Sequence, residues 1–269
     1  MSISSLDTYK NLLRTSRDVN NFNIATITSV AGRPFDLWAA IVPTGTTPTS
    51  PVQLFSSSTG AIGQANAEGG LENFIIGARF SALNPGTYLI CDRLSHQGGL
   101  SGNASGVLQT LNLPTAPLPR YTDGKGVMAG LTINTAVGTT LTSVSAEYTN
   151  ELGVSARNTP LTGIGSTGFN NLRRFIFLPL QEGDFGVRSI ESIRTTASTG
   201  TQGNIGVVLF KPLYVICVEA GSGVVSGGFI TGFTSGGIPK IENDACLFLI
   251  NISMFTSPLG SGALIIVES

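Results

Sequence analysis

The sequence predicts an all-β protein, built from one or two antiparallel β-sandwich modules of the jelly-roll or immunoglobulin-like kind, with a short N-terminal helix or arm. Short runs rich in Val, Ile, Phe and Thr alternate with clusters of Gly, Pro, Asn and Ser along most of the chain. Helical spacing of apolar residues occurs in one segment only, near the N-terminus. A chain of 269 residues is long enough for one large domain or two of ordinary size.

Residues 1–20 form the predicted helix or arm. Its apolar positions recur at helical spacing, and they are Leu6, Tyr9, Leu12 and Leu13. A helix of about three turns is marginal alone in water, so this stripe needs a surface to pack against. The polar stretch at 14–23 has the composition of a tether. We expect the four apolar residues to form an interface with a neighbouring subunit; packing on the chain's own sandwich is the alternative.

Residues 21–115 are predicted to form a first β module. Its expected strands are the runs IATITSV, DLWAAIV, VQLFSS, NFIIGARFSA and GTYLICDRL, each bounded by turn-forming residues. The stretch LNLPTAPLPRYTDGKG at 111–126 is rich in proline and glycine and has no periodicity. It is therefore expected to run over a surface, and we place the module boundary there.

Residues 116–269 are predicted to form a second β module, whose last strands may close onto the first. The segment TNELG is expected to make a tight turn that Asn150 starts and in which Gly153 has a positive φ. Gly183 or Gly186 is expected to do the same in QEGDFG. Imperfect alternation in VRSIESI predicts a bulge near Ser192. Pro212 is expected to interrupt a strand or to place it at an edge.

The charge composition argues against nucleic acid and membrane as partners. Charged residues make up 12% of the chain, with 15 basic and 16 acidic, whereas roughly 25% is usual. There is no Lys/Arg cluster of the kind that binds nucleic acid, no apolar run long enough to span a bilayer, and no secretion signal. A surface with so little charge is expected to be covered by other subunits, which predicts a homo-oligomer.

Candidate reactive groups are few. Cys91, Cys217 and Cys246 lie in apolar runs with no metal-binding spacing, and we expect buried free thiols in a reducing compartment and no metal site. A hydrolase would need His96 as the base, with Asp92 or Asp123 to orient it, but no G-x-S-x-G segment supplies the serine. We therefore predict no catalytic residue and a solvated loop position for His96.

Cofactor and sugar sites also have weak sequence support. The glycine-rich stretch 98–106 lacks the phosphate-binding motifs and is expected to be a flexible loop, so no cofactor is predicted. A sugar-stacking platform would draw on the aromatic residues Trp38, Tyr88, Tyr121, Tyr148 and Tyr214. With a single Trp in the chain, we expect Trp38 to belong to the core instead.

One ordered series of motifs resembles a known group of proteins. The segments LPRYTDGKG, EYTNELGVSAR, FLPLQEGDFGVRS and VVLFKPL follow each other between residues 118 and 213, roughly a third of the chain. Together they are similar to a β-rich region of virion structural proteins of tailed bacteriophages, in which a YTN-x-x-G hairpin precedes an LPL-x-x-GD-x-GVRS strand pair and an L-x-(K/R)-PL strand.

The resemblance implies a non-enzymatic structural subunit of a phage virion, made in the host cytoplasm. It favours a head-associated, decoration or capsid-stabilising protein that acts through contacts with copies of itself and with other virion proteins. A tail, neck or fibre component is the first alternative. The second is a carbohydrate- or receptor-binding β-sandwich module, which would need exposed aromatic side chains in a groove.

Overall fold

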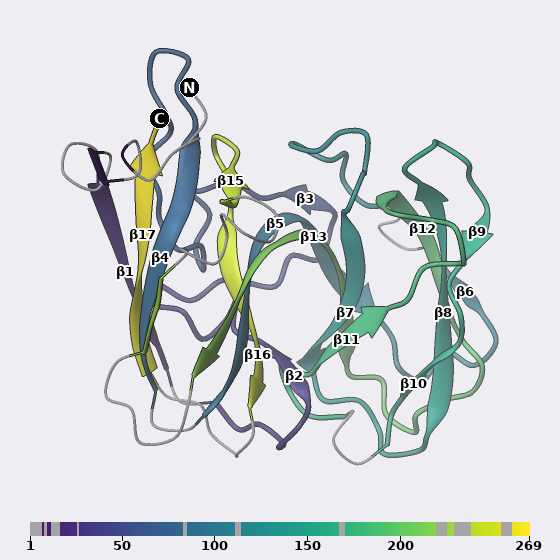
Figure 1. Cartoon of the computed structure of the whole chain (residues 1–269). Helices are drawn as coiled ribbons and strands as arrows, with labels where there is room; N and C mark the ends of the chain where they lie inside the picture. Colours follow the sequence, from purple (N-terminus) through teal and green to yellow (C-terminus); the bar gives the residue numbers. More distant parts are fainter. Residues whose placement is uncertain are drawn as a thin grey trace.

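The protein is all-β in its computed structural model, and the predicted fold class is confirmed. The structure describes residues 17–25, 27–82, 85–110, 114–166, 170–218, 225–228, 238–253 and 260–269, together with Asp7, Lys10 and Asn11. These residues contain seventeen strands in three sheets, which we name A, B and C, and every pairing between named strands is antiparallel. In Figure 1 the sheets lie in three layers from left to right, with sheet B in the middle.

Sheet A forms one outer layer. Its strand order is β1 (Arg17–Ile24), β17 (Gly260–Glu268), β4 (Asn73–Ala82) and β14 (Val225–Gly228), and β15 (Lys240–Ile241) also pairs with β4. The stretch that we predicted to be a polar tether is therefore mostly strand β1, and that prediction is wrong. Phe22 and Ile24 are buried whereas Asn21 and Asn23 are exposed, so the polar residues belong to the outer face of an amphipathic strand.

Sheet B is the middle layer and contains the longest strands. Its order is β11 (Phe175–Leu178), β7 (Met128–Thr135), β13 (Asn204–Val218), β5 (Gly86–Leu100), β16 (Leu247–Ser253) and β2 (Pro34–Asp36), and β3 (Val52–Gln53) also pairs with β5. Most of the DLWAAIV run is not a strand, because residues 38–40 form a turn after β2. The two predicted modules are interleaved in this sheet, because β16 from the second lies between β5 and β2 from the first.

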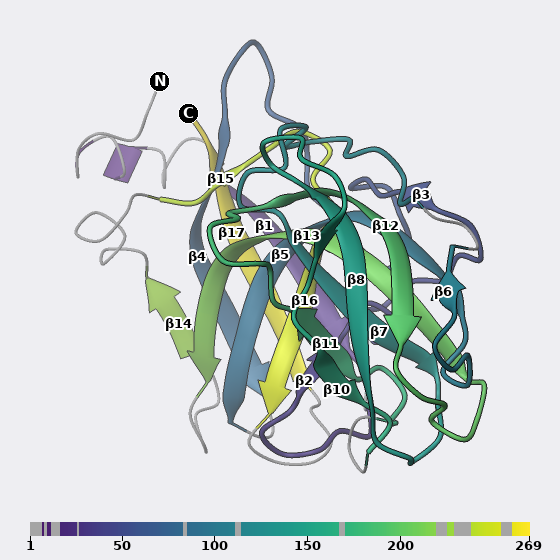
Figure 2. The ribbon, with the colours of Figure 1, turned by 90° about the vertical axis from the view of Figure 1, so that its right-hand side faces the viewer.

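Sheet C is the second outer layer, and it faces the viewer in Figure 2. Its order is β10 (Thr162–Ile164), β8 (Thr142–Asn150), β12 (Val187–Thr195) and β6 (Leu108–Gln109), and β9 (Arg157–Asn158) also pairs with β8. Along β8, buried and half-buried residues alternate throughout, which is the pattern of a strand with one face on a core.

Hydrophobic cores fill both spaces between the layers. The core between sheets A and B includes Phe22, Phe80, Leu264, Tyr88, Ile90 and Leu249. The core between sheets B and C includes Leu131, Val207, Leu209, Val144, Tyr148 and Ile190. A further cluster on sheet B joins Phe175, Phe210 and Phe248 to Trp38. The middle sheet therefore has apolar contacts on both faces, which explains why its strands read as nearly continuous apolar runs.

The last strands pair with strands of the predicted first module. Strand β16 pairs with β5 and β2, and β17 pairs with β4 and β1. Strand β13 lies between β5, from the first segment, and β7, from the second. The division into modules 21–115 and 116–269 stays a prediction about folding units.

Several local predictions are confirmed. Gly153 and Gly183 have positive φ values of 80° and 89°, and the β8–β9 turn begins at Asn150. The pairing of β12 with β8 shifts between Ile190 and Ser192, which is the predicted bulge. Pro212 lies just beyond Phe210, where β13 loses β7 as a neighbour, so the proline occupies an edge position as expected.

Two local predictions are wrong. His96 is not in a solvated loop but inside β5, where it is 1% exposed, and residues 98–100 of the expected flexible loop complete the same strand. Cys91 and Cys246 are buried as predicted, but Cys217 is exposed. Cys217 lies on the part of β13 that extends past β7, where alternate residues face outward.

Candidate interface at the tip of sheet C

The predicted docking residues Leu6, Tyr9, Leu12 and Leu13 lie outside the described residues. The backbone at Asp7, Lys10 and Asn11 is helical, and these three residues are exposed. Asp7 and Lys10 form an exposed ion pair at 4.0 Å. The docking role of the arm stays a prediction.

His96 is isolated from both aspartates that a hydrolase would need. It pairs with Val52 of β3 and Val208 of β13, and neither ring nitrogen has a hydrogen-bond partner among the described residues. Burial, with a smaller contribution from the Arg93 charge, holds the pKa of His96 well below its usual range. Asp92 instead binds Arg120, and Asp123 accepts from the Lys125 N–H. The hydrolase arrangement considered from the sequence is therefore not assembled by these residues.

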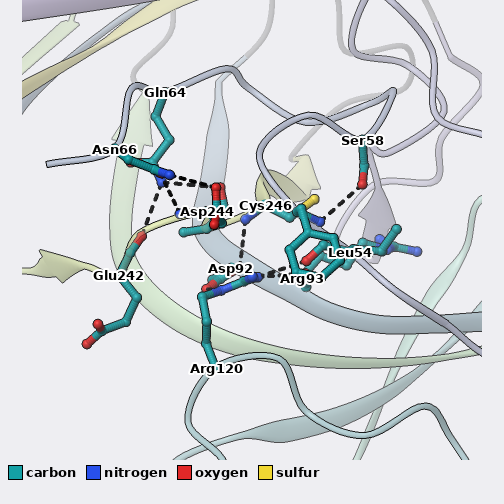
Figure 3. Close-up of polar contacts among 12 residues, drawn as sticks. Leu54, Ser58, Gln64, Asn66, Asp92, Arg93, Arg120, Glu242, Asp244 and Cys246 are labelled. Atoms are coloured by element: carbon teal, nitrogen blue, oxygen red, sulfur yellow. Dashed lines mark hydrogen bonds and ion pairs between the residues drawn. The ribbon is translucent and has the colours of Figure 1, made fainter.

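A buried ion pair of Asp92 and Arg120 joins four segments of the chain (Figure 3). Arg120 donates to both Asp92 oxygens, at 2.8 Å and 2.6 Å, and to the Leu54 carbonyl at 3.1 Å. The Cys246 N–H donates to Asp92 at 2.9 Å. Burial raises the pKa of Asp92 and outweighs the opposite effect of Arg120. Such a pair, once buried, fixes the relative position of its segments because removing one partner leaves an uncompensated charge.

A second buried ion pair lies beside the core cluster of sheet B. Arg93 donates to both oxygens of Asp36, at 3.1 Å and 2.9 Å, and its guanidinium lies 4.8 Å from the Trp38 ring centroid and 4.7 Å from that of Phe248. Trp38 is 4% exposed, so its predicted core position is confirmed. Tyr88 and Tyr148 are also buried, and these three rings cannot form a sugar-stacking surface.

The residues that carry the phage-protein resemblance meet at Asp184. Its carboxylate accepts from Arg157 Nε at 2.9 Å and Nη2 at 3.1 Å, from Asn150 Nδ2 at 2.8 Å, and from the Tyr148 hydroxyl. The Tyr148 oxygen in turn accepts from the Gln181 N–H at 2.9 Å. Hydrogen bonding from Arg157 is the main reason that the pKa of Asp184 is lowered, to about 2. We name these five residues the Asp184 cluster.

Further contacts extend this region towards the 121–126 loop. Arg188 donates to the Glu151 carbonyl at 3.1 Å from Nε and 2.6 Å from Nη2, and to the Asp123 carbonyl at 3.2 Å. The Gly126 N–H donates to the Phe185 carbonyl at 2.8 Å. Lys211 donates to the Lys125 carbonyl at 2.7 Å. Each of the four motifs of the resemblance therefore has a hydrogen bond to at least one of the others near this end of sheet C.

Apolar side chains project from this rigid region. Leu152 is 76% exposed, Phe185 is 74% exposed and Val154 is 49% exposed. The Phe185 N–H donates to the Glu151 side chain at 3.1 Å, which places the two turns side by side. We name Leu152, Val154 and Phe185 the tip patch. Single exposed apolar residues are ordinary, whereas an exposed apolar patch made by several residues is typical of an interaction site.

Sequence reasoning recognised both turns but missed the tip patch. Turn positions of this kind usually carry polar residues, whereas T-N-E-L-G and G-D-F-G each include a large apolar residue within two positions of the turn glycine. An apolar residue where a polar one is usual was the feature of the sequence that could have revealed the tip patch. The contact between the two turns could not be read from the sequence, because 30 or so residues separate them.

Comparisons with known proteins give only distant similarity. No protein-family description matches the chain, and no curated protein matches its sequence. The structure of infectious bursal disease virus, Gx strain, is similar with 10% identity over 94% of this chain and 82% of that chain, at a TM-score of 0.23. The crystal structure of the infectious bursal disease virus VP2 subviral particle is similar with 9% identity over 94% and 80%, at a TM-score of 0.17. Neither similarity is close enough to support an argument about this chain.

The described residues show neither a metal site nor a membrane-spanning helix. They contain no group of three or more His, Cys, Asp or Glu side chains arranged to hold a metal ion. Within the same part of the chain, no helix has the length and apolar character needed to cross a bilayer.

Proposed function

We propose that this protein is a non-enzymatic structural subunit of a phage virion, with a head-associated, decoration or capsid-stabilising role. It acts through protein–protein contacts with copies of itself or with other virion proteins. The tip patch is the surface through which it docks.

One observation carries this proposal. The motifs that resemble phage virion proteins are not scattered over the fold, since Tyr148, Asn150 and Asp184 from two of them form one hydrogen-bonded cluster. That cluster holds two turns whose exposed side chains, Leu152 and Phe185, are apolar. A rigid support lowers the entropic cost of docking, because the contacting groups are already positioned before the partner binds.

The location in the particle can be tested directly. We would purify virions from cells that produce this protein and label them with antibody fragments raised against it, for imaging by electron microscopy. Label over the head supports the proposed role. Label on the tail, neck or fibres would instead support the first alternative, and virions that lack the protein would overturn the proposal.

The role of the tip patch can be tested with a matched pair of variants. Replacing both Leu152 and Phe185 with Ser is expected to reduce incorporation into virions at least about tenfold, because large apolar side chains dominate docking energies. The control replaces Leu141 and Leu161, which directly precede β8 and β10 and are each 64% exposed, with Ser. Equal incorporation of the two double variants would show that the tip patch is not the docking surface.

A further inference from the structure

The outer face of sheet A carries a hollow of about 730 Å³. It is lined by strands β1, β4 and β17, with Asn21 and Asn23 on one side, Arg79 and Ser81 on the other, and Ser261 and Ala263 between them. Figure 1 shows these strands at the left edge of the molecule, on the opposite side from sheet C. This site is therefore separate from the tip patch.

The strand register explains the hollow. Asn21 pairs across the sheet with Ala263, which pairs with Arg79, and the next outward row is Asn23, Ser261 and Ser81. The middle strand contributes only small side chains to these rows, so a valley runs over it between the two asparagines of β1 and Arg79 of β4. The valley runs along the strands.

Contacts on the core side of sheet A fix the register of β1, β17 and β4. A side chain at Gly262 would place its Cβ 2.5 Å from the Phe22 ring, so only glycine leaves room for that ring on the core side. Phe22 and Phe80 then pack against each other in the core, with tilted rings whose centroids are 5.2 Å apart. A one-residue slip would exchange the two faces, so the outward rows are well determined.

Arg79 is the charged group of the hollow. Its side chain is exposed and makes no hydrogen bond or ion pair with any residue that the structure describes, in contrast to Arg120 and Arg157, which bind carboxylates. No acidic side chain is present among the described residues that line the hollow. A guanidinium in a neutral setting is best complemented by a carboxylate, which can accept two parallel hydrogen bonds from it.

Asn21 and Asn23 indicate the shape of the ligand. They lie on the same face of β1, two residues apart, which is a spacing of about 6.6–6.8 Å along a strand. Each side-chain amide offers a donor and an acceptor. The backbone of an extended peptide repeats its donors and acceptors at the same two-residue interval, so one peptide can bind both amides.

We propose that the hollow binds an extended, acidic segment of a partner protein. Its backbone amides bind Asn21 and Asn23, and one of its carboxylates pairs with Arg79 while small side chains of the segment fill the valley over Ala263. This inference is argued from the residues of sheet A alone and does not depend on the proposed virion role.

The probe for this proposal is a terminally blocked peptide of alternating Ser and Asp, with a Ser/Asn peptide of equal length as the uncharged comparison. Binding to the full chain is followed by NMR through the backbone amide shifts of β1, β4 and β17. We expect the Asp peptide to shift signals from residues 19–23, 79–81 and 261–263, and to bind about tenfold more tightly than the Asn peptide, as one charge-assisted pair allows.

Three variants make the test specific. Arg79→Gln is expected to weaken binding of the Asp peptide about tenfold, whereas Arg194→Gln, a change at an exposed arginine on sheet C, should have no effect. Ser261→Phe fills the valley without changing charge and should also abolish binding. Equal affinity for both peptides, or an Arg79→Gln variant that binds normally, would overturn the proposal. So would self-association of the free protein that Arg79→Gln abolishes, because a second copy would then occupy the hollow.

Discussion

At the scale of single residues, burial and hydrogen bonding determine what each titratable group contributes. Asp184 and Asp92 both pair with an arginine, yet the pKa of Asp184 is lowered and that of Asp92 is raised. The difference arises because burial is the largest influence on Asp92, whereas hydrogen bonds from Arg157, Tyr148 and Asn150 outweigh it at Asp184. Asp184 is therefore the clearer stabilising contact.

Asp184→Asn is expected to lower the free energy of unfolding by about 1–2 kcal/mol near neutral pH, because it removes a charge-assisted acceptor. A carboxylate with a lowered folded-state pKa stabilises the fold above its ordinary pKa, and this contribution is lost as the pH falls towards about 2. The difference between wild type and variant should therefore shrink below about pH 4. Urea denaturation over that range measures it. Asp123→Asn, at an exposed turn, is the control and should cost little; equal losses would contradict the assignment.

The buried His96 side chain is expected to make the stability of the fold depend on pH in a second way. Its folded-state pKa is lowered, so the unfolded chain binds a proton that the folded chain excludes, and stability falls as the pH drops below about 6.5. The slope contributed by one such group reaches about 1.4 kcal/mol per pH unit. His96→Leu should remove this dependence, since both ring nitrogens lack partners and an apolar side chain fits the same buried strand. Parallel stability–pH curves for the two proteins would show that the site titrates normally.

At the scale of elements, close backbone approach determines where the turns of the sheet C tip can lie. A Cβ at Gly186 would lie 2.0 Å from the Gly124 carbonyl oxygen, so only glycine allows the 121–126 loop to pair there through Lys125. Gly183 has a different role, because it has a positive φ and open space around its Cβ position. Gly186 is therefore required by close backbone contact, whereas Gly183 is favoured by its positive φ.

Gly186→Ala is expected to destabilise the protein by about 3 kcal/mol, since the backbone must shift to relieve the contact. Gly183→Ala is the matched control and should cost about 1 kcal/mol, the ordinary penalty for a side chain at positive φ. Thermal unfolding of both variants gives the comparison. A smaller loss for Gly186→Ala than for Gly183→Ala would show that the two segments are not in close contact.

At the scale of the whole molecule, the middle sheet ties the chain together. Strand β5 has β13 on one side and β16 on the other, and both partners come from more than a hundred residues later in the chain. The buried pairs Asp92–Arg120 and Asp36–Arg93 add links between distant segments. Neither half of the chain can complete sheet B by itself.

We therefore expect that the fragments 21–115 and 116–269, expressed separately, do not fold, and that the full chain unfolds in one cooperative transition. An edge of β5 or β13 without its partner would expose unpaired backbone groups and apolar faces. NMR spectra of each fragment, and of the two mixed, provide the measurement. A well-dispersed spectrum from either fragment alone would support two independent modules instead.

The sequence by itself determined the local features of this protein. Period-two alternation and turn chemistry predicted the all-β class, the Asn150–Gly153 turn and the bulge near Ser192. They left two alternatives each for the QEGDFG turn, where Gly183 and not Gly186 has the positive φ, and for Pro212, which lies at an edge and does not interrupt its strand. These features depend on residues close together in the chain, and their steric causes are the same in any fold. The burial of Trp38, Cys91 and Cys246 was also predictable, because apolar runs of this kind are seldom exposed.

Only the tertiary structure decided which strands are neighbours. The wrong predictions for His96 and Cys217 follow from that. His96 is buried because β13 and the short β3 cover both edges of β5 at that position. Cys217 is exposed because β13 extends beyond the end of its pairing with β7. The tip patch and the hollow of sheet A likewise depend on turns and strands brought together from distant parts of the chain. Alternation tells which residues share a face of a strand, but it does not specify the partner strand, since pairing is decided by the combined burial of all layers.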